Sequence, residues 1–241
     1  MMSENNGQSK KDILKDLNAV KTGGKFLTRV VGTNDVFCKE SFSDEERMIF
    51  EAMSDYATNE LLPMSQKELN TKDEKLIRKL VEQMGELGFL GVDVPEKYGG
   101  SEMTKTGMCI LAEGISKSGS PSFCTVWNVQ TSIGSLGIIW YGNDEQKKRW
   151  LPGISSGKKI AAFGLTEPEA GSDATNSKTT GVLSDDGKHY ILNGQKIFIS
   201  NGGWADIFTV ALKIDGKFSS IVVEKGTPGF EIGKRRKENG Y

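Results

Sequence analysis

The chain has 241 residues, which is enough for one large domain or two modest domains with buried cores. Its 31 lysines and arginines nearly balance 32 aspartates and glutamates, so the net charge of −1 creates no global field that would attract nucleic acid or an acidic membrane. The cysteines are odd in number and far apart, which argues against a disulfide framework and a zinc site and fits a reducing compartment. They are Cys38, Cys109 and Cys124.

The start of the chain is polar. Residues 1–11 lack the apolar core of a signal peptide, and the acidic residues Glu4 and Asp12 fit poorly with an organelle transit peptide. No apolar run in the sequence approaches the length that a bilayer span needs. We therefore predict a cytoplasmic protein, and membrane association has no support in the sequence.

Helical periodicity follows a polar tail and extended arm in residues 1–40. Ser43 and Glu46 have the spacing of a capping box at the start of the first helix, which Pro63 ends. Asp73 begins a second helix that Gly88 stops. The other predicted elements are a turn-rich loop over 91–100, helices near 105–117 and 122–141, and an amphipathic piece over 144–151 that ends at Pro152. We assign residues 41–157 to an N-terminal helical domain.

After Gly157 the sequence alternates between apolar and polar residues, and turn residues separate the runs. Hairpin turns are predicted at 185–187 and 215–216. The predicted strands are Ile160–Leu165, Lys178–Leu183, His189–Leu192, Lys196–Ser200, Ile207–Lys213 and Ser219–Glu224. The fold class is therefore α+β, with an all-α domain followed by a small β-barrel or sandwich domain over residues 158–241.

Two segments of the β domain have the composition of a binding site. The first strand stops at Thr166-Glu167-Pro168 and enters a small-residue turn, Ala170-Gly171-Ser172, whose backbone amides can approach a phosphate closely. About twenty residues later, the alternation predicts that Phe198 and Ser200 share one face of a strand and that Ile199 points to the opposite face.

Together the two segments, 163–173 and 193–203, resemble the flavin-binding middle domain of the acyl-CoA dehydrogenase family. The resemblance extends to 90–100, 137–142 and Leu151-Pro152, and it covers roughly residues 23–235. The arm over 33–37 is most similar to the very-long-chain branch. Family members continue with the rest of the β domain and a C-terminal helical bundle. We therefore expect residues 158–241 to be an incomplete middle domain, with the bundle absent.

The resemblance implies an FAD-dependent enzyme of fatty acid β-oxidation. It would convert long-chain acyl-CoA thioesters to trans-2-enoyl-CoA and pass electrons to an electron-transfer flavoprotein. The bundle usually carries the catalytic glutamate and most of the oligomer interface. We therefore assign no catalytic residue in this chain, expect the 241 residues alone to be inactive, and expect a homo-oligomer at full length.

The resemblance also implies roles for individual residues in FAD binding. The hydroxyl groups of Thr166 and Ser200 would hydrogen-bond the flavin edge near N5 and O4. Phe198 stands where many members carry Trp and would shield the ring. The implied cofactor-binding set is Phe163, Leu165, Thr166, Gly171, Ser172, Phe198, Ile199 and Ser200. Within it, Gly171 and Ser172 would meet the pyrophosphate, Leu165 would use main-chain groups, and Ser172 would also touch the substrate.

Other charged residues have ordinary interpretations. Glu167, Glu169 and Asp173 are expected to cap main chain and face solvent, because carboxylates beside a phosphate would repel it. His189 is expected to be an exposed strand residue, and without a second ligand nearby we predict no metal site. The basic run 234–237 is expected to be a solvated tail.

Two alternatives stay open at this point. The same fold carries acyl-CoA oxidases and flavin-dependent monooxygenases, although the run from Leu165 to Asp173 favours a dehydrogenase. The second alternative is a non-catalytic protein, namely a truncated module that binds flavin or serves only for interaction.

The helices near 108–115 and 126–139 would line an acyl channel or simply pack closely. Unpaired strand edges in a truncated β domain also predict poor solubility.

Overall fold

The computed structural model describes residues 38–64, 66–69 and 73–233. The chain divides into two compact units, residues 1–48 and 49–241. In the first unit, the 3₁₀ helix η2 (Lys39–Ser41) precedes the start of α2 (Asp44–Tyr56). The predicted capping box is confirmed, because the Ser43 N–H donates to the Glu46 carboxylate at 2.9 Å and the Glu46 N–H donates to Ser43 Oγ at 3.1 Å. The predicted arm before residue 38 and the basic run 234–237 lie outside the described residues.

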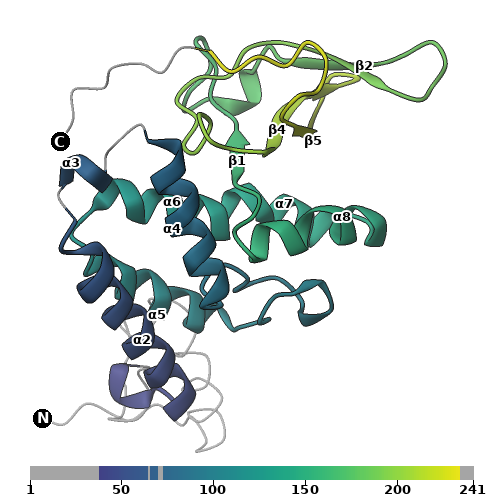
Figure 1. Ribbon diagram of the computed structural model, residues 1–241. Coiled ribbons are helices and arrows are strands. Elements are labelled where there is room, and N and C mark those ends of the chain that lie inside the picture. The colour runs from purple at the N-terminus through teal and green to yellow at the C-terminus, as the bar shows by residue number, and fades with distance from the viewer. Residues whose placement is uncertain (1–37, 65, 70–72, 234–241) are drawn as a thin grey trace, which may run out of the picture. The chain divides into compact units, whose positions relative to one another are not determined.

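Helices make up the first half of the second unit (Figure 1). After the end of α2, these are the π-helical turn η3 (Ala57–Leu61), α3 (Gln66–Leu69), α4 (Glu74–Glu86), the 3₁₀ turn η4 (Glu96–Tyr98), α5 (Lys105–Ser116), α6 (Pro121–Thr131), α7 (Ile133–Tyr141) and α8 (Asp144–Ser155). Asp73 caps α4 by accepting from the N–H groups of Lys75 and Leu76. The face of α4 that carries Leu80 and Met84 is buried in the same hydrophobic core as Trp127.

The predicted helix over 122–141 is wrong, because the structure contains two helices separated at Ser132. Ser132 has φ −121° and ψ −107°, outside the helical region. Its hydroxyl donates to the Asn128 carbonyl at 2.5 Å, and the preceding Thr131 hydroxyl donates to the Trp127 carbonyl at 3.0 Å. Side-chain hydroxyl groups of this kind compete with the main-chain ladder, so two in succession favour a break.

The predicted helix end at Pro152 is also wrong, because α8 continues to Ser155. A proline inside a helix removes one hydrogen bond and costs on the order of 3 kcal/mol in an exposed helix. Here Leu151 and Ile154 are fully buried on either side of it, and the Ile154 carbonyl accepts from the Gln130 side chain at 3.0 Å. Tertiary packing therefore carries the helix past the proline.

The strands of the described residues form one mixed, five-stranded sheet with β4 at its centre. Their bounds are β1 (Ala161–Gly164), β2 (Thr180–Leu183), β3 (Tyr190–Asn193), β4 (Ile207–Ile214) and β5 (Lys217–Glu224). β1 and β2 run parallel to β4 along one edge, in the registers Ala161↔Ile207 and Thr180↔Lys213. β5 pairs antiparallel along the whole of β4 through a tight turn in which Asp215 and Gly216 both have positive φ.

The predicted strand Lys196–Ser200 is wrong. These residues form no strand ladder, and Phe198 has a φ of 57°, in the left-handed region. A residue in this conformation reverses the local direction of the backbone, so the alternation of side chains between two faces does not apply here. Of these residues, only Ile197 forms a main-chain bond to the exit of β1, at Thr166.

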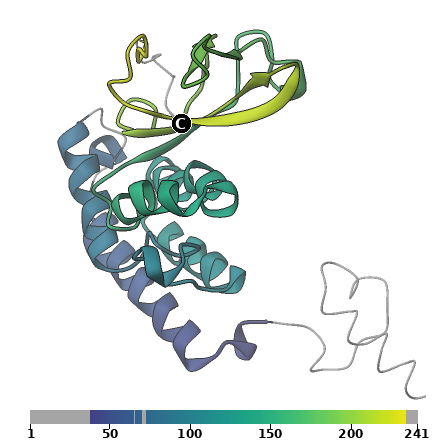
Figure 2. The ribbon, with the colours of Figure 1, turned by 90° about the vertical axis from the view of Figure 1, so that its right-hand side faces the viewer.

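The sheet packs on one side of α6 and α7, as Figures 1 and 2 show. The fully buried Gln130 joins the two layers: its amide nitrogen donates to the carbonyls of Ile154 and Lys159, and its oxygen accepts from the Ala161 N–H at 2.8 Å. The predicted α+β architecture is therefore confirmed, with a helical domain followed by a mixed sheet. Across the described residues, no helix is long and apolar enough to cross a membrane.

Candidate functional site

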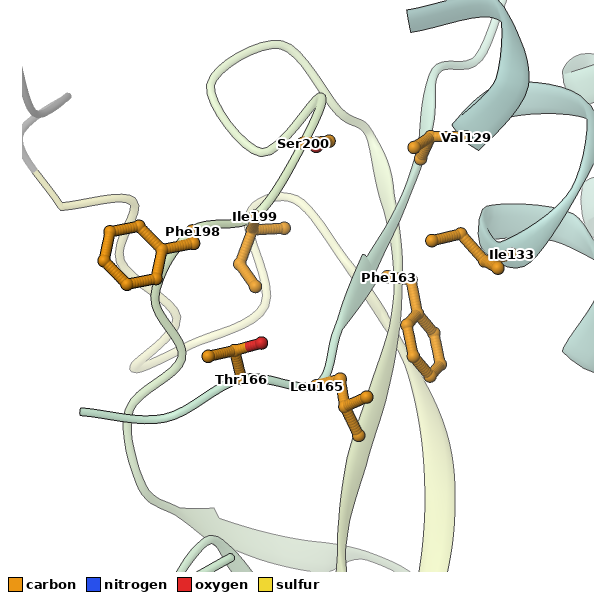
Figure 3. A pocket seen from close by; sticks show the side chains of 8 residues that line it. All are labelled: Val129, Ile133, Phe163, Leu165, Thr166, Phe198, Ile199 and Ser200. Atoms are coloured by element: carbon orange, nitrogen blue, oxygen red, sulfur yellow. The ribbon is translucent and has the colours of Figure 1, made fainter. Parts of the chain in front are cut away.

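A half-open hollow of about 170 Å³ lies where the helices meet the sheet. Three parts of the chain line it: the junction of α6 and α7, the strand β1 with its exit, and the irregular segment before β4 (Figure 3). The lining residues are Val129, Ile133, Phe163, Leu165, Thr166, Phe198, Ile199 and Ser200. Thr166 and Ser200 supply hydroxyl groups, which both donate and accept hydrogen bonds, in an otherwise apolar wall.

Two bonds join the β1 exit to the irregular segment. The Ile197 N–H donates to the Thr166 carbonyl at 2.8 Å, and Lys196 Nζ donates to the Leu165 carbonyl at 3.0 Å. The two sequence segments that we expected to converge therefore do so, although not as paired strands.

The other end of the irregular segment is fixed by Asn201. Its side-chain nitrogen donates to the carbonyls of Val126 and Ala161, each at 3.1 Å, so one amide group ties the segment to α6 and to β1. Asn201 has a φ of 63°, a conformation that asparagine tolerates better than most residues. The main chain of Phe198 to Ser200 is thus held at both ends.

Six of the eight residues predicted to bind a cofactor line this hollow. Gly171 and Ser172 do not; they lie in an exposed turn after the Glu167↔Ala170 bridge. A Cβ atom at Gly171 would meet nothing within 4 Å, so no tight packing requires glycine at this position. Ser172 is not brought to the lining either, and its predicted contacts with pyrophosphate and substrate stay predictions.

The predicted faces of the second segment are wrong. Ile199 was expected opposite Phe198 and Ser200, yet all three line the hollow because the segment is not a strand. Phe198 stands at the rim with 60% of its surface exposed. In Figure 3 the Thr166 hydroxyl points into the space beside Ile199.

The predicted solvent exposure of Glu167 is wrong as well, while Glu169 and Asp173 are exposed as expected. The side chain of Glu167 is only 4% exposed and forms an ion pair with Lys196 at 2.7 Å. No local sequence pattern predicts this pair, because Glu167 and Lys196 are far apart in the sequence and two strands, β2 and β3, lie between them. Val129 and Ile133 were also missed as lining residues, since the helix break beside Ile133 was not foreseen.

Hydrogen bonds keep the carboxyl group of Glu167 ionised although the side chain is buried. The carboxylate accepts from Lys196 Nζ, from the N–H of Lys178 at 2.5 Å, from the N–H of Thr179 at 3.0 Å and from the Thr179 hydroxyl. Burial raises the pKa of Glu167, but the Lys196, Thr179 and Lys178 donors together outweigh it and lower the pKa from its usual 4.5 to about 2.

The donor set of the hollow fits one edge of a planar, polar-edged aromatic ring rather than a metal ion. Two hydroxyl-bearing residues, Thr166 and Ser200, line a space that is otherwise bordered by aromatic and aliphatic side chains. The volume is below the roughly 300–1,000 Å³ of a typical ligand pocket, so only part of such a ring would lie inside. In the part of the chain that the structure describes, no three His, Cys, Asp or Glu side chains gather to hold a metal ion, and His189 is exposed just before β3.

These features define a class of protein: a helical domain followed by a mixed sheet, with a hydroxyl-bearing hollow at their junction. Residues 43–158 match the profile described as "Acyl-CoA dehydrogenase, N-terminal domain" and residues 162–241 match "Acyl-CoA dehydrogenase, middle domain". The chain belongs to the acyl-CoA dehydrogenase family.

Individual relatives agree with this assignment. A probable acyl-CoA dehydrogenase of Bacillus subtilis is 44% identical over 222 residues, which is 92% of this chain and 37% of that protein. The very long-chain specific acyl-CoA dehydrogenase of rat mitochondria is 36% identical over 85% of this chain and 31% of its own length. A crystal structure of acyl-CoA dehydrogenase complexed with FAD from Bacillus anthracis superposes with a TM-score of 0.83 at 41% identity, over 90% of this chain and 37% of that one. The chain thus spans about a third of the length of these relatives.

Proposed function

We propose that this chain is the FAD-binding portion of an acyl-CoA dehydrogenase, comprising its N-terminal and middle domains. The observation that carries the proposal is the convergence of the Thr166 and Ser200 segments on one hollow. A relative of 41% identity and the same fold has been crystallised with FAD, which supports the choice of cofactor.

The proposed reaction oxidises an acyl-CoA thioester at its α and β carbons. Bound FAD supplies a two-electron acceptor for the hydride that leaves the β-carbon. A general base takes the α-proton, and the two C–H bonds are replaced by the trans double bond of the enoyl-CoA. No group in the chain is assigned as that base.

The residues of the hollow would bind and orient the flavin ring. Thr166 and Ser200 would donate hydroxyl hydrogen bonds to its polar edge, where negative charge increases on reduction. The main-chain oxygens of Leu165 and Thr166 each accept one hydrogen bond, from Lys196 and Ile197, and each keeps a second lone pair. We propose that Leu165 contacts the ring through its main chain and that Thr166 contacts it through its hydroxyl group.

The apolar part of the wall would exclude water from the ring. Phe163 and Ile199 line the interior, and the exposed ring of Phe198 can cover the flavin face once it is bound. The exposed turn with Gly171 and Ser172 has free access for a pyrophosphate, which is the role that we propose for it, with Ser172 also meeting the substrate.

Finer aspects of the function belong to the same proposal. We propose a long-chain acyl-CoA as substrate, an electron-transfer flavoprotein as electron acceptor, and a homo-oligomer at full length. The arm over 33–37 supports the chain length, and one of the relatives is named as very long-chain specific, whereas the relative of 44% identity is named without a chain length.

The test uses the full-length enzyme that contains this chain. Purified protein should carry FAD, and palmitoyl-CoA should bleach its flavin absorbance. Thr166→Val and Ser200→Ala should each weaken FAD retention about tenfold, which corresponds to about 1.4 kcal/mol for one lost hydrogen bond. Thr180→Val, at an exposed position of β2, is the matched control and should retain FAD normally. Unchanged absorbance with every acyl-CoA would reject the proposal, and stoichiometric peroxide would indicate an oxidase instead.

A further inference from the structure

A buried pair of opposite charges lies directly behind the wall of the hollow. The side chains of Lys196 and Glu167 are 11% and 4% exposed, and their charged atoms are 2.7 Å apart. Neither residue lines the hollow itself. Each is, however, one or two residues away from residues that do, since Leu165 and Thr166 precede Glu167 and Phe198 follows Lys196.

The pair joins three pieces of chain at this point. Lys196 Nζ also donates to the Leu165 carbonyl at 3.0 Å, and the Glu167 carboxylate accepts from the main chain of Lys178 and Thr179 before β2. A Cβ atom at Gly194 would lie 2.3 Å from Thr179 Oγ1, so glycine lets the segment after β3 approach closely. Lys196 therefore anchors the segment that leads to Phe198, and its partner Glu167 is held in turn by the main chain before β2.

The two charges cancel each other, but Glu167 has more additional hydrogen-bond partners than Lys196 has. Without Lys196, the Glu167 carboxylate would keep three other donors, from Lys178 and Thr179, and would stay ionised. Without the Glu167 charge, Lys196 would keep the Leu165 carbonyl as its hydrogen-bond partner and would have no carboxylate beside it. Removing either partner thus leaves a net charge of known sign beside the hollow.

We propose that Lys196 and Glu167 are a charge-balanced positioning pair for the flavin, which holds the segments of Thr166 and Phe198 together while leaving the site electrically neutral. The inference rests on the proposed function, because it supposes that a flavin ring occupies the hollow. A flavin ring gains negative charge on reduction, so its midpoint potential responds to the sign of a nearby uncompensated charge.

The experiment measures the midpoint potential of the bound flavin in the full-length enzyme by spectroelectrochemical titration. Glu167→Gln, which leaves a net positive charge, should raise the potential relative to wild type, and Lys196→Met, which leaves a net negative charge, should lower it. The double variant should return toward the wild-type value, and Lys196→Arg should stay close to it. Glu169→Gln in the turn after β1 and Lys188→Met in the turn between β2 and β3 are matched controls at exposed positions and should shift nothing.

A pair that merely supports the fold would give a different pattern. Both single variants would then lose flavin and thermal stability together, without potential shifts of opposite sign. Shifts of the same sign, or none, overturn the inference. If Lys196→Met does not fold, the comparison of Glu167→Gln with the double variant decides, and equal potentials reject it. A wild-type enzyme that binds no flavin would instead reject the proposed function.

Discussion

The hydrogen bonds of Glu167 predict a specific dependence of stability on pH. Its pKa is lowered from the usual 4.5 to about 2, and each unit corresponds to about 1.36 kcal/mol. The ionised carboxylate should therefore contribute about 3 kcal/mol to the free energy of unfolding. Because the folded-state pKa is below the unfolded-state pKa, this contribution is complete above about pH 5 and is lost as the pH falls toward 2. The side chain is almost fully buried, so solvent should screen it little.

The variant Glu167→Gln keeps the shape of the side chain and removes its titration. In urea unfolding of the full-length enzyme near neutral pH, it should be about 3 kcal/mol less stable than wild type. The difference should shrink steadily below about pH 4 and nearly vanish near pH 2, because the wild-type carboxyl is then protonated too. Glu169→Gln, exposed in the same turn, should match wild type throughout. A stability difference that stays constant with pH, or one below about 0.5 kcal/mol at neutral pH, would refute the reasoning.

Three further outcomes are expected. Asn201→Asp should lower the free energy of unfolding by about 2–4 kcal/mol, because it turns a carboxylate toward two carbonyl groups. The control Asn176→Asp, at an exposed position, should leave it unchanged, and equal urea midpoints for the two variants would contradict this. Arg78→Met should cost about 3 kcal/mol in the same assay, because it breaks a two-bond pair with Asp206, and Lys79→Met, exposed on the same helix, should be neutral. The 241-residue chain tested by itself should show no turnover with palmitoyl-CoA, since the base is expected elsewhere, and measurable dehydrogenation by it would oppose that assignment.

Local signals in the sequence were sufficient for most of the fold. The capping box at Ser43 and the turn at Asp215-Gly216 act over a few residues, and both were predicted correctly. The helix through Pro152 depends on contacts made by Gln130 and the core, which a local pattern does not encode, whereas the break at Ser132 accompanies two hydroxyl groups that bond the main chain one turn earlier. Element boundaries failed where tertiary packing overrides local preference.

The site shows the same division. Thr166 and Ser200 could be placed on one hollow because each lies in a recognisable segment. Their neighbours Glu167 and Lys196 could not be paired, because nothing in either segment indicates that the two charges meet. The turn with Ser172 was expected at the site but does not line the hollow. Ser172 is close to Thr166 in the sequence, but this closeness does not determine the direction of an exposed turn.

The irregular stretch from Lys196 to Asn201 has a second consequence. It is bonded to Thr166 at one end of β1 and to Ala161 at the other, on a strand whose only ladder partner in the described residues is β4. It therefore shields the outer margin of β1 from pairing with another molecule, without itself offering a straight template. Loosening this stretch should release the cofactor and start self-association in a single event, so that light scattering and flavin loss rise at the same temperature.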